Sequence, residues 1–76
     1  METNKPIKEI RLGAIKAAIW KSNKEGRVNH SVKITRIYKQ DDNWKDSNYF
    51  SKTDLALVTK VADLAHTYIY QENNQQ

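Results

Sequence analysis

The sequence predicts an α+β domain in which an antiparallel sheet of three to four strands is followed by one C-terminal helix, in the order β-β-β-β-α. Two observations support this class. Over residues 7–50, apolar and polar residues alternate, and turn-forming residues separate the alternating segments. After residue 50 the apolar residues recur every three or four positions instead, which is typical of an amphipathic helix.

The first alternating segment covers residues 7–21 and contains Gly13. Ile10 and Leu12 share one face before the glycine, and the alternation continues after it. Since glycine permits a bulge or a kink, the segment is either two short strands or one long strand bent at Gly13. The alanine-rich residues 12–21 leave a helix as a competing interpretation, but the glycine and the β-branched neighbours favour strand.

The middle of the chain is interpreted as a loop followed by the clearest strand. Residues 22–30 are mostly polar and contain Gly26, which predicts a loop. Residues 31–39 alternate again, but the apolar phase slips between Ile34 and Ile37. That slip indicates either a bulge or a strand that uses both faces.

A hairpin and a helix complete the predicted fold. Residues 40–43 form a tight turn, since Asp and Asn side chains bond nearby amides, and residues 44–50 return as a strand. Residues 51–54, Ser-Lys-Thr-Asp, have the spacing of a helix capping box, with Thr53 as an alternative cap. A helix of about 16–18 residues follows, because one wide face is apolar. That face consists of Leu57, Val58, Val61, Leu64, Ala65, Tyr68 and Ile69.

Length and composition limit the domain organisation. The 76 residues predict one domain over residues 7–70, with a flexible arm over residues 1–6 and a disordered Gln- and Asn-rich tail over residues 71–76. Only 38% of the residues are hydrophobic and none is cysteine, so the core is small and no disulfide supports it. A two-fold homodimer is the expected source of additional stability. The residues expected at its interface are Leu57, Leu64 and Tyr68.

Several function classes are not indicated by the sequence. It has no Ser/His/Asp spacing, no Gly-rich phosphate loop and no metal-binding His-Glu helix, so no enzyme activity, metal, cofactor or small-molecule substrate is expected. The longest apolar run, residues 17–20, is far too short to span a membrane, and no signal peptide is apparent. A cytoplasmic protein without a membrane partner is therefore expected, with association with the nucleoid as a further option.

The positive charge of the chain is concentrated in its first half. Ten basic and two acidic residues lie between Lys5 and Lys39, giving +8, whereas residues 40–76 carry −3. Basic and aromatic residues are interleaved through the predicted strands, which offers phosphate neutralisation together with flat surfaces for unstacked bases. The residues expected to bind nucleic acid are Lys16, Trp20, Lys33, Arg36, Tyr38, Trp44 and Lys45. The alternative is that these aromatic residues fill the core and the charged strand face is merely solvated.

Residues 32–39, the acidic turn after them, residues 44–50 and the helix-opening residues 51–55 resemble a known family. This is the single-stranded-DNA-binding transcriptional regulator fold, whose eukaryotic type is the transcriptional positive coactivator (positive cofactor four). The resemblance extends over residues 9–69 and implies a curved sheet, a C-terminal helix and a dimer that presents two sheet ridges to single strands. It also implies phosphate contacts from the basic residues Lys16, Lys33, Arg36 and Lys45 and base stacking on the aromatic residues Trp20, Tyr38 and Trp44. Two departures are a shorter connection before residue 31 and the intrusion of Asp46 into the second hairpin strand.

The sequence therefore predicts a protein that binds single-stranded DNA with little sequence specificity and acts in transcription, replication or repair. Two alternatives stay open at this point. One is a protein-interaction module that dimerises through its helix, and the other is an RNA-binding protein.

Overall fold

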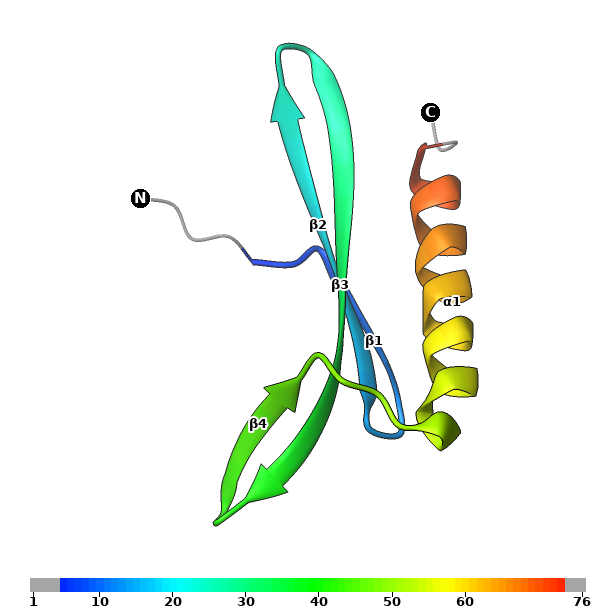
Figure 1. Ribbon diagram of the computed structural model, residues 1–76. Coiled ribbons are helices and arrows are strands. Elements are labelled where there is room, and N and C mark those ends of the chain that lie inside the picture. The colour runs from blue at the N-terminus through cyan, green and yellow to red at the C-terminus, as the bar shows by residue number, and fades with distance from the viewer. Residues whose placement is uncertain (1–4, 74–76) are drawn as a thin grey trace.

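The computed structural model describes residues 5–73 and shows a four-stranded antiparallel sheet followed by a single helix (Figure 1). The strands lie in the order β1-β2-β3-β4, and each pairs with the next. The elements are β1 (Lys8–Leu12), β2 (Ile15–Lys24), β3 (Arg27–Gln40), β4 (Asn43–Ser47), a 3₁₀ turn η1 (Lys52–Asp54) and α1 (Leu55–Asn73). The predicted α+β class and the order β-β-β-β-α are confirmed, and Gly13 separates two strands rather than bending one.

The helix α1 covers one face of the sheet, so the molecule has two layers (Figure 1). Ile15 and Ala17 of β2 pack with Val61 of α1, and all three side chains are fully buried. Burial of an aliphatic side chain of this kind contributes about 1.5–3 kcal/mol, so this small cluster supplies only a modest stabilisation. Among residues 5–73, no helix combines the length and the apolar character needed to cross a membrane.

Two of the three hairpins close through turns in which both central residues have positive φ. These residues are Glu25 (56°) and Gly26 (78°) between β2 and β3, and Asp41 (53°) and Asp42 (67°) between β3 and β4. Positive φ at both positions is the type I′ geometry, whose twist matches that of the flanking strands. The tight turn predicted at residues 40–43 is thus confirmed.

The prediction of a loop over residues 22–30 is wrong. Here β2 and β3 continue to pair as far as Lys24 and Arg27, leaving only a two-residue turn. This part of the hairpin, residues 20–31, projects beyond β1 and β4 at the top of Figure 1 and is called the distal hairpin below. Because solvent reaches most of this hairpin on both faces, its residues are polar on both faces, and the alternation that identifies a half-buried strand is lost.

The phase slip in β3 reflects a strand that uses both faces. Pairing with β2 proceeds residue by residue without a bulge, so Ile34 and Ile37 lie on opposite faces of the sheet. The next strand, β4, ends at Ser47, earlier than the predicted residue 50. The chain then leaves the sheet, and Phe50 packs against the core cluster.

The capping segment predicted before the helix is present at Ser51. The Ser51 N–H and hydroxyl both donate to Asp54 Oδ2 at 2.9 Å, and the Asp54 N–H donates to the Ser51 carbonyl at 2.9 Å. The segment opens the 3₁₀ turn η1, which leads directly into α1. The backbone and side-chain hydrogen bonds from Ser51, followed by the nearby Arg36 guanidinium, lower the pKa of Asp54.

The C-terminal end of α1 contacts the distal hairpin. The His30 Nε2 of β3 donates to Glu72 Oε1 at 2.9 Å, and Lys21 Nζ of β2 lies 3.7 Å from Glu72 Oε2. Residues 71–73 therefore belong to the helix, although the sequence predicted a disordered tail from residue 71. The rest of that tail and residues 1–4 of the predicted arm lie outside the described residues.

Candidate nucleic-acid interface

The register of the strands divides their side chains between two faces of the sheet. One face packs against α1, and the other, which we call the open face, points away from it. The open face carries Glu9, Arg11, Lys16, Ala18, Trp20, Ser22, Lys24, Arg27, Asn29, Ser31, Lys33, Thr35, Ile37, Lys39, Trp44 and Asp46. This set includes six basic residues, two acidic residues and both tryptophans of the chain. The open face is thus cationic and aromatic, whereas the covered face supplies the core.

A hollow of about 140 Å³, which we call the central hollow, lies in the open face. The small side chains of Ala18 and Thr35 line it and are buried at the middle of the sheet. All four strands contribute, because its lining consists of Pro6, Glu9, Lys16, Ala18, Trp20, Lys33, Thr35 and Asp46. Since β1 and β4 are the two outer strands, their presence around one hollow shows that the open face is concave.

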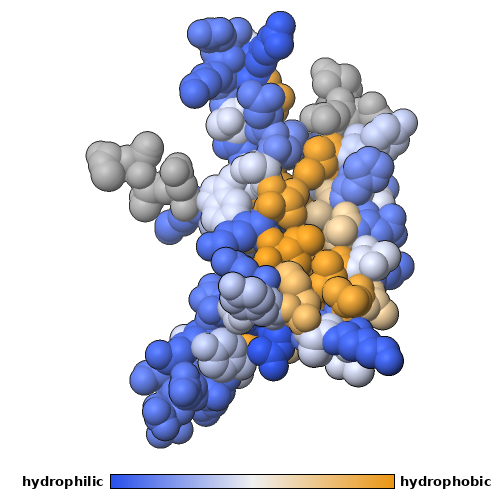
Figure 2. Space-filling model, viewed as in Figure 1, coloured by the Kyte–Doolittle hydropathy of each residue, from blue (hydrophilic) through white to orange (hydrophobic). Residues whose placement is uncertain are grey.

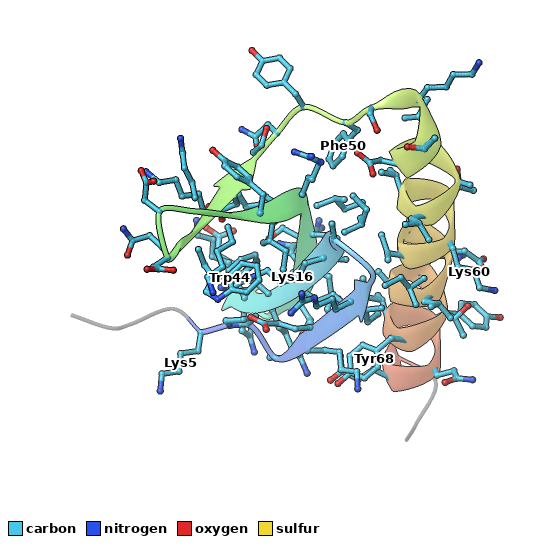
Figure 3. The ribbon with its side chains drawn as sticks, turned by 90° about the horizontal axis from the view of Figure 1, so that it is seen from below. Lys5, Lys16, Trp44, Phe50, Lys60 and Tyr68 are labelled. Atoms are coloured by element: carbon cyan, nitrogen blue, oxygen red, sulfur yellow. The ribbon has the colours of Figure 1, made fainter. Side chains whose placement is uncertain are left out.

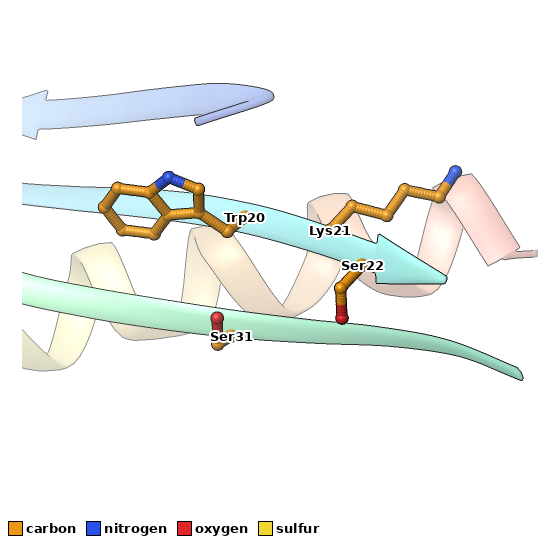
Figure 4. Close-up of a pocket in the computed structure, with 4 residues that line it drawn as sticks. All are labelled: Trp20, Lys21, Ser22 and Ser31. Atoms are coloured by element: carbon orange, nitrogen blue, oxygen red, sulfur yellow. The ribbon is translucent and has the colours of Figure 1, made fainter. Parts of the chain in front are cut away.

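Trp20 also lines a second depression next to the central hollow. The second depression measures about 420 Å³ and is lined by Trp20, Lys21, Ser22 and Ser31 (Figure 4). Figure 4 shows the indole of Trp20 lying along β2 and directed away from Ser22, with Ser31 on the neighbouring strand β3. Trp20 is half-buried, and its side chain lines both depressions.

Trp44 lies on the side of the sheet away from α1 (Figure 3) and is 64% exposed. Two cations approach its ring: the Arg11 guanidinium and Lys39 Nζ each lie 5.9 Å from the ring centroid. Contacts of this kind contribute about 0.5–1 kcal/mol at exposed sites. Because Arg11 comes from β1 and Trp44 from β4, this contact again joins the two outer strands across the open face.

The salt bridges that the described residues form lie on the covered face. Within residues 5–73 they join Glu72 to Lys21 and His30, and Asp54 to Arg36. None of these salt bridges within residues 5–73 involves a residue of the open face.

The structure brings together four of the seven residues predicted to bind nucleic acid. Lys16, Trp20 and Lys33 line the central hollow, and Trp44 lies on the same face. The other three, Arg36, Tyr38 and Lys45, lie on the helix side of the sheet.

Arg36 is engaged by the fold itself. Its Nε lies 3.2 Å from Asp54 Oδ2 at the start of the helix, and its guanidinium lies 5.8 Å from the ring centroid of Tyr38. Tyr38 and Lys45 pair with each other on β3 and β4. These three residues therefore form a group on the face opposite the central hollow.

The helix residues predicted for a dimer interface lie toward the β1 side of the molecule. Leu57 packs against the chain's own core cluster, and its Cδ1 lies 3.4 Å from the position of a Cβ on Gly13. Tyr68 lies under the ammonium group of Lys8, which is 5.7 Å from its ring centroid, and Leu64 is half-buried. Each of these side chains is therefore at least partly covered within one chain.

Arg11 and Lys39 belong to the open face but were not predicted as site residues. The register places Arg11 opposite Lys16 and Lys39 opposite Trp44, so each is a direct cross-strand neighbour of a predicted residue. Correct hairpin boundaries would have revealed both, because residues directly opposite one another in a sheet share a face.

Among residues 5–73, no three His, Cys, Asp or Glu side chains are grouped so as to hold a metal ion. No protein-family model matches the chain, and neither a curated protein nor a solved structure shows significant similarity to it. The resemblance to the coactivator family stays a prediction, and the open face itself is the basis for assigning a function.

Proposed function

We propose that the protein binds single-stranded DNA with little sequence specificity, as a homodimer, in transcription, replication or repair. The observation that carries the proposal is the open face, where both tryptophans and six basic residues lie on a concave surface that α1 does not cover. The predicted binding residues Arg36, Tyr38 and Lys45 are left out of the proposed site because they lie on the other face.

The basic residues supply affinity through the phosphate backbone. Lys16 and Lys33 flank the central hollow from β2 and β3, and Arg11 and Lys39 add charge around Trp44. Each phosphate neutralised by such a residue releases condensed counterions, so binding weakens as salt rises. This phosphate contribution to affinity does not depend on the base sequence of the DNA, which supports binding with little sequence specificity.

The tryptophans provide a reason for preferring single strands. An aromatic ring can stack only on a base that is free of its own neighbours, and such stacking contributes about 1–3 kcal/mol per base. Trp20 is the stronger candidate, because it lines two adjacent depressions in which bases can be accommodated. Trp44 has two cations near its ring, so the ring and these cations can contact a base and its phosphate together.

Titration of the intact protein with a fluorescently labelled dT oligonucleotide at a series of salt concentrations tests this proposal. Binding is expected at low salt, with the logarithm of the association constant falling linearly with the logarithm of the salt concentration. Matched duplex DNA and single-stranded RNA are the competitors. Absence of binding at low salt, or equal affinity for the duplex, would overturn the proposal, and stronger competition by RNA would reassign the surface to RNA.

A further inference from the structure

The strand β3 has a free edge over part of its length. On one side it pairs with β2 along residues 27–36, but on the other side β4 pairs only with residues 36–40. Within residues 5–73, no strand covers the outer edge of residues 27–35. This edge is nine residues long, which exceeds an average strand.

The phase of the backbone along this edge follows from the turn. In a hairpin closed by a two-residue turn, the residues flanking the turn form a hydrogen-bonded pair, here Lys24 and Arg27, and alternate residues then point their N–H and C=O groups outward. The Ile37 N–H, which donates to the Ala14 carbonyl at 2.7 Å, gives the same phase at the far end of the strand. The outward-pointing residues, called the edge residues below, are Val28, His30, Val32 and Ile34.

The side chains of the edge residues border an apolar surface. Val28 and Val32 are 46% and 40% exposed, and Ile34 is half-buried. Figure 2, which has the same view as Figure 1, shows apolar side chains gathered between the sheet and α1. In this view β3 lies in front of β1. Glu72 of α1 hydrogen-bonds to His30 of β3, so the helix face that carries Glu72 is turned toward β3. Ile69, three residues earlier, lies on the same helix face.

Natural proteins usually protect a free edge with lysine, proline or a bulge, because its unpaired backbone groups otherwise recruit another strand. None of the edge residues is lysine or proline, and the register of β3 contains no bulge. The free edge of β2 in the distal hairpin differs, since Lys21 points outward there. The edge of β3 thus presents four outward-facing residues, of which three are apolar, whereas Arg27 and Lys33 of the same stretch have their side chains on the open face.

The sequence of this edge is complementary to itself. A two-fold axis at Ser31 places Ser31 opposite its own copy, Val28 opposite Ile34 and His30 opposite Val32. In this register, the outward-pointing N–H and C=O groups of all four edge residues form hydrogen bonds with the second copy. On the open face, the same register sets Arg27 against Thr35 and Lys33 against Asn29. No two like charges are therefore opposed, although the segment is basic.

We propose that two copies of the chain pair antiparallel through residues 27–35 of β3, about a two-fold axis at Ser31, to form one continuous eight-stranded sheet. Both α1 helices lie on one side of this sheet and both open faces on the other, and Val28 and Val32 are covered. The inference gives the dimer of the proposed function an interface different from the predicted helix residues. It rests on that dimeric state and does not depend on DNA binding.

Sedimentation equilibrium of the intact chain, with and without an edge substitution, tests the interface. The wild type is expected to reach the mass of two 8.9 kDa chains. Val32→Lys should shift self-association to about tenfold or higher concentrations, because it places a charge in the apolar contact. Ile7→Lys is the matched control, since Ile7 is also 40% exposed but lies beside β1. A monomeric wild type, or equal effects of the two substitutions, would overturn the inference.

The position of the axis is tested by a single introduced cysteine, as the chain has none. Residues opposite each other in a non-hydrogen-bonded antiparallel pair have Cα atoms about 4.5 Å apart, within the range that a disulfide spans. Ser31→Cys should therefore form a disulfide-linked dimer in oxidised glutathione. Asn29→Cys, exposed on the same strand and face, should not, because the register separates its two copies by about 13 Å along the strand.

Equal cross-linking of both cysteine variants would rule out the axis at Ser31. The outcome is independent of DNA binding. A monomer that binds the dT oligonucleotide would refute the interface and the dimeric state but not DNA binding, and a dimer with the expected cross-link that ignores nucleic acid would refute DNA binding alone.

Discussion

Arg36 and Asp54 connect the middle of β3 to the turn that opens α1, with Arg36 Nε 3.2 Å from Asp54 Oδ2. The same carboxylate oxygen accepts hydrogen bonds from the N–H and the hydroxyl of Ser51. The Asp54 carboxylate therefore contacts both the sheet, through Arg36, and the turn that opens the helix, through Ser51. Arg36, which the sequence predicts to bind nucleic acid, thus forms an ion pair between the sheet and the start of the helix.

This arrangement predicts an acid-sensitive contribution to stability. The hydrogen bonds from Ser51 and the charge of Arg36 lower the pKa of Asp54 in the folded state, so the unfolded chain binds that proton more readily. The contribution is complete above the ordinary aspartate pKa of about 4 and is lost as the pH falls through the lower folded value. Chemical unfolding across this range should show a decline that Asp54→Asn flattens, with lower stability of the variant at neutral pH. The same acid dependence in both proteins would contradict the assignment.

The turn between β2 and β3 predicts a stabilising substitution. Glu25 has φ 56°, a region that disfavours L-residues other than Asn and Asp. Glu25→Asn creates the Asn-Gly pair preferred by type I′ turns and should raise the free energy of unfolding by about 0.5–1 kcal/mol. Gly26→Ala is the opposite control: a Cβ there meets nothing within 4 Å, so its cost of about 1 kcal/mol comes from φ alone. Urea unfolding measures both, and a destabilised Glu25→Asn would argue against this turn geometry.

The elements that sequence reasoning located correctly are those with one buried face. The helix was recognised from its apolar spacing and from Ser51, and β2 from Ile15, Ala17 and Ile19, because burial on one side imposes a period on the sequence. The distal hairpin was missed because both of its faces are largely solvated. The length of α1 was underestimated because its last turn is held by polar contacts of Glu72 rather than by an apolar stripe.

The candidate site was predictable only in part, for a geometrical reason. Residue type alone selects basic and aromatic positions, but the face on which each lies depends on register and on where a strand begins. Lys16, Trp20 and Lys33 share the open face because their strands pair without a bulge. Arg36, three residues after Lys33, has the opposite parity and lies on the helix side, and no compositional signal distinguishes the two.

Two lysines on opposite faces of the sheet can show whether binding of the oligonucleotide depends on the open face or only on the net charge of the protein. Lys33 lines the central hollow, whereas Lys45 lies on the helix side of β4. Lys33→Ala should weaken binding of the dT oligonucleotide and reduce the salt slope by about 0.7, the value for one phosphate contact on a single strand. Lys45→Ala should leave the slope nearly unchanged. The slopes follow from anisotropy titrations at several salt concentrations, and equal effects of the two variants would show that net charge, rather than the open face, governs binding.

Trp20 should report directly on base stacking once the other tryptophan is removed. In Trp44→Phe, Trp20 is the sole indole, and stacking on a base should quench its fluorescence as the dT oligonucleotide is added. Trp20→Ala should cost about 1–3 kcal/mol of binding free energy, and Trp20→Phe should recover part of it because an aromatic ring is restored. Since Trp20 is half-buried, urea unfolding of each variant is needed to confirm that the sheet is retained. Binding that leaves the Trp20 emission unchanged would mean that the bases do not stack there and that phosphate contacts alone hold the strand.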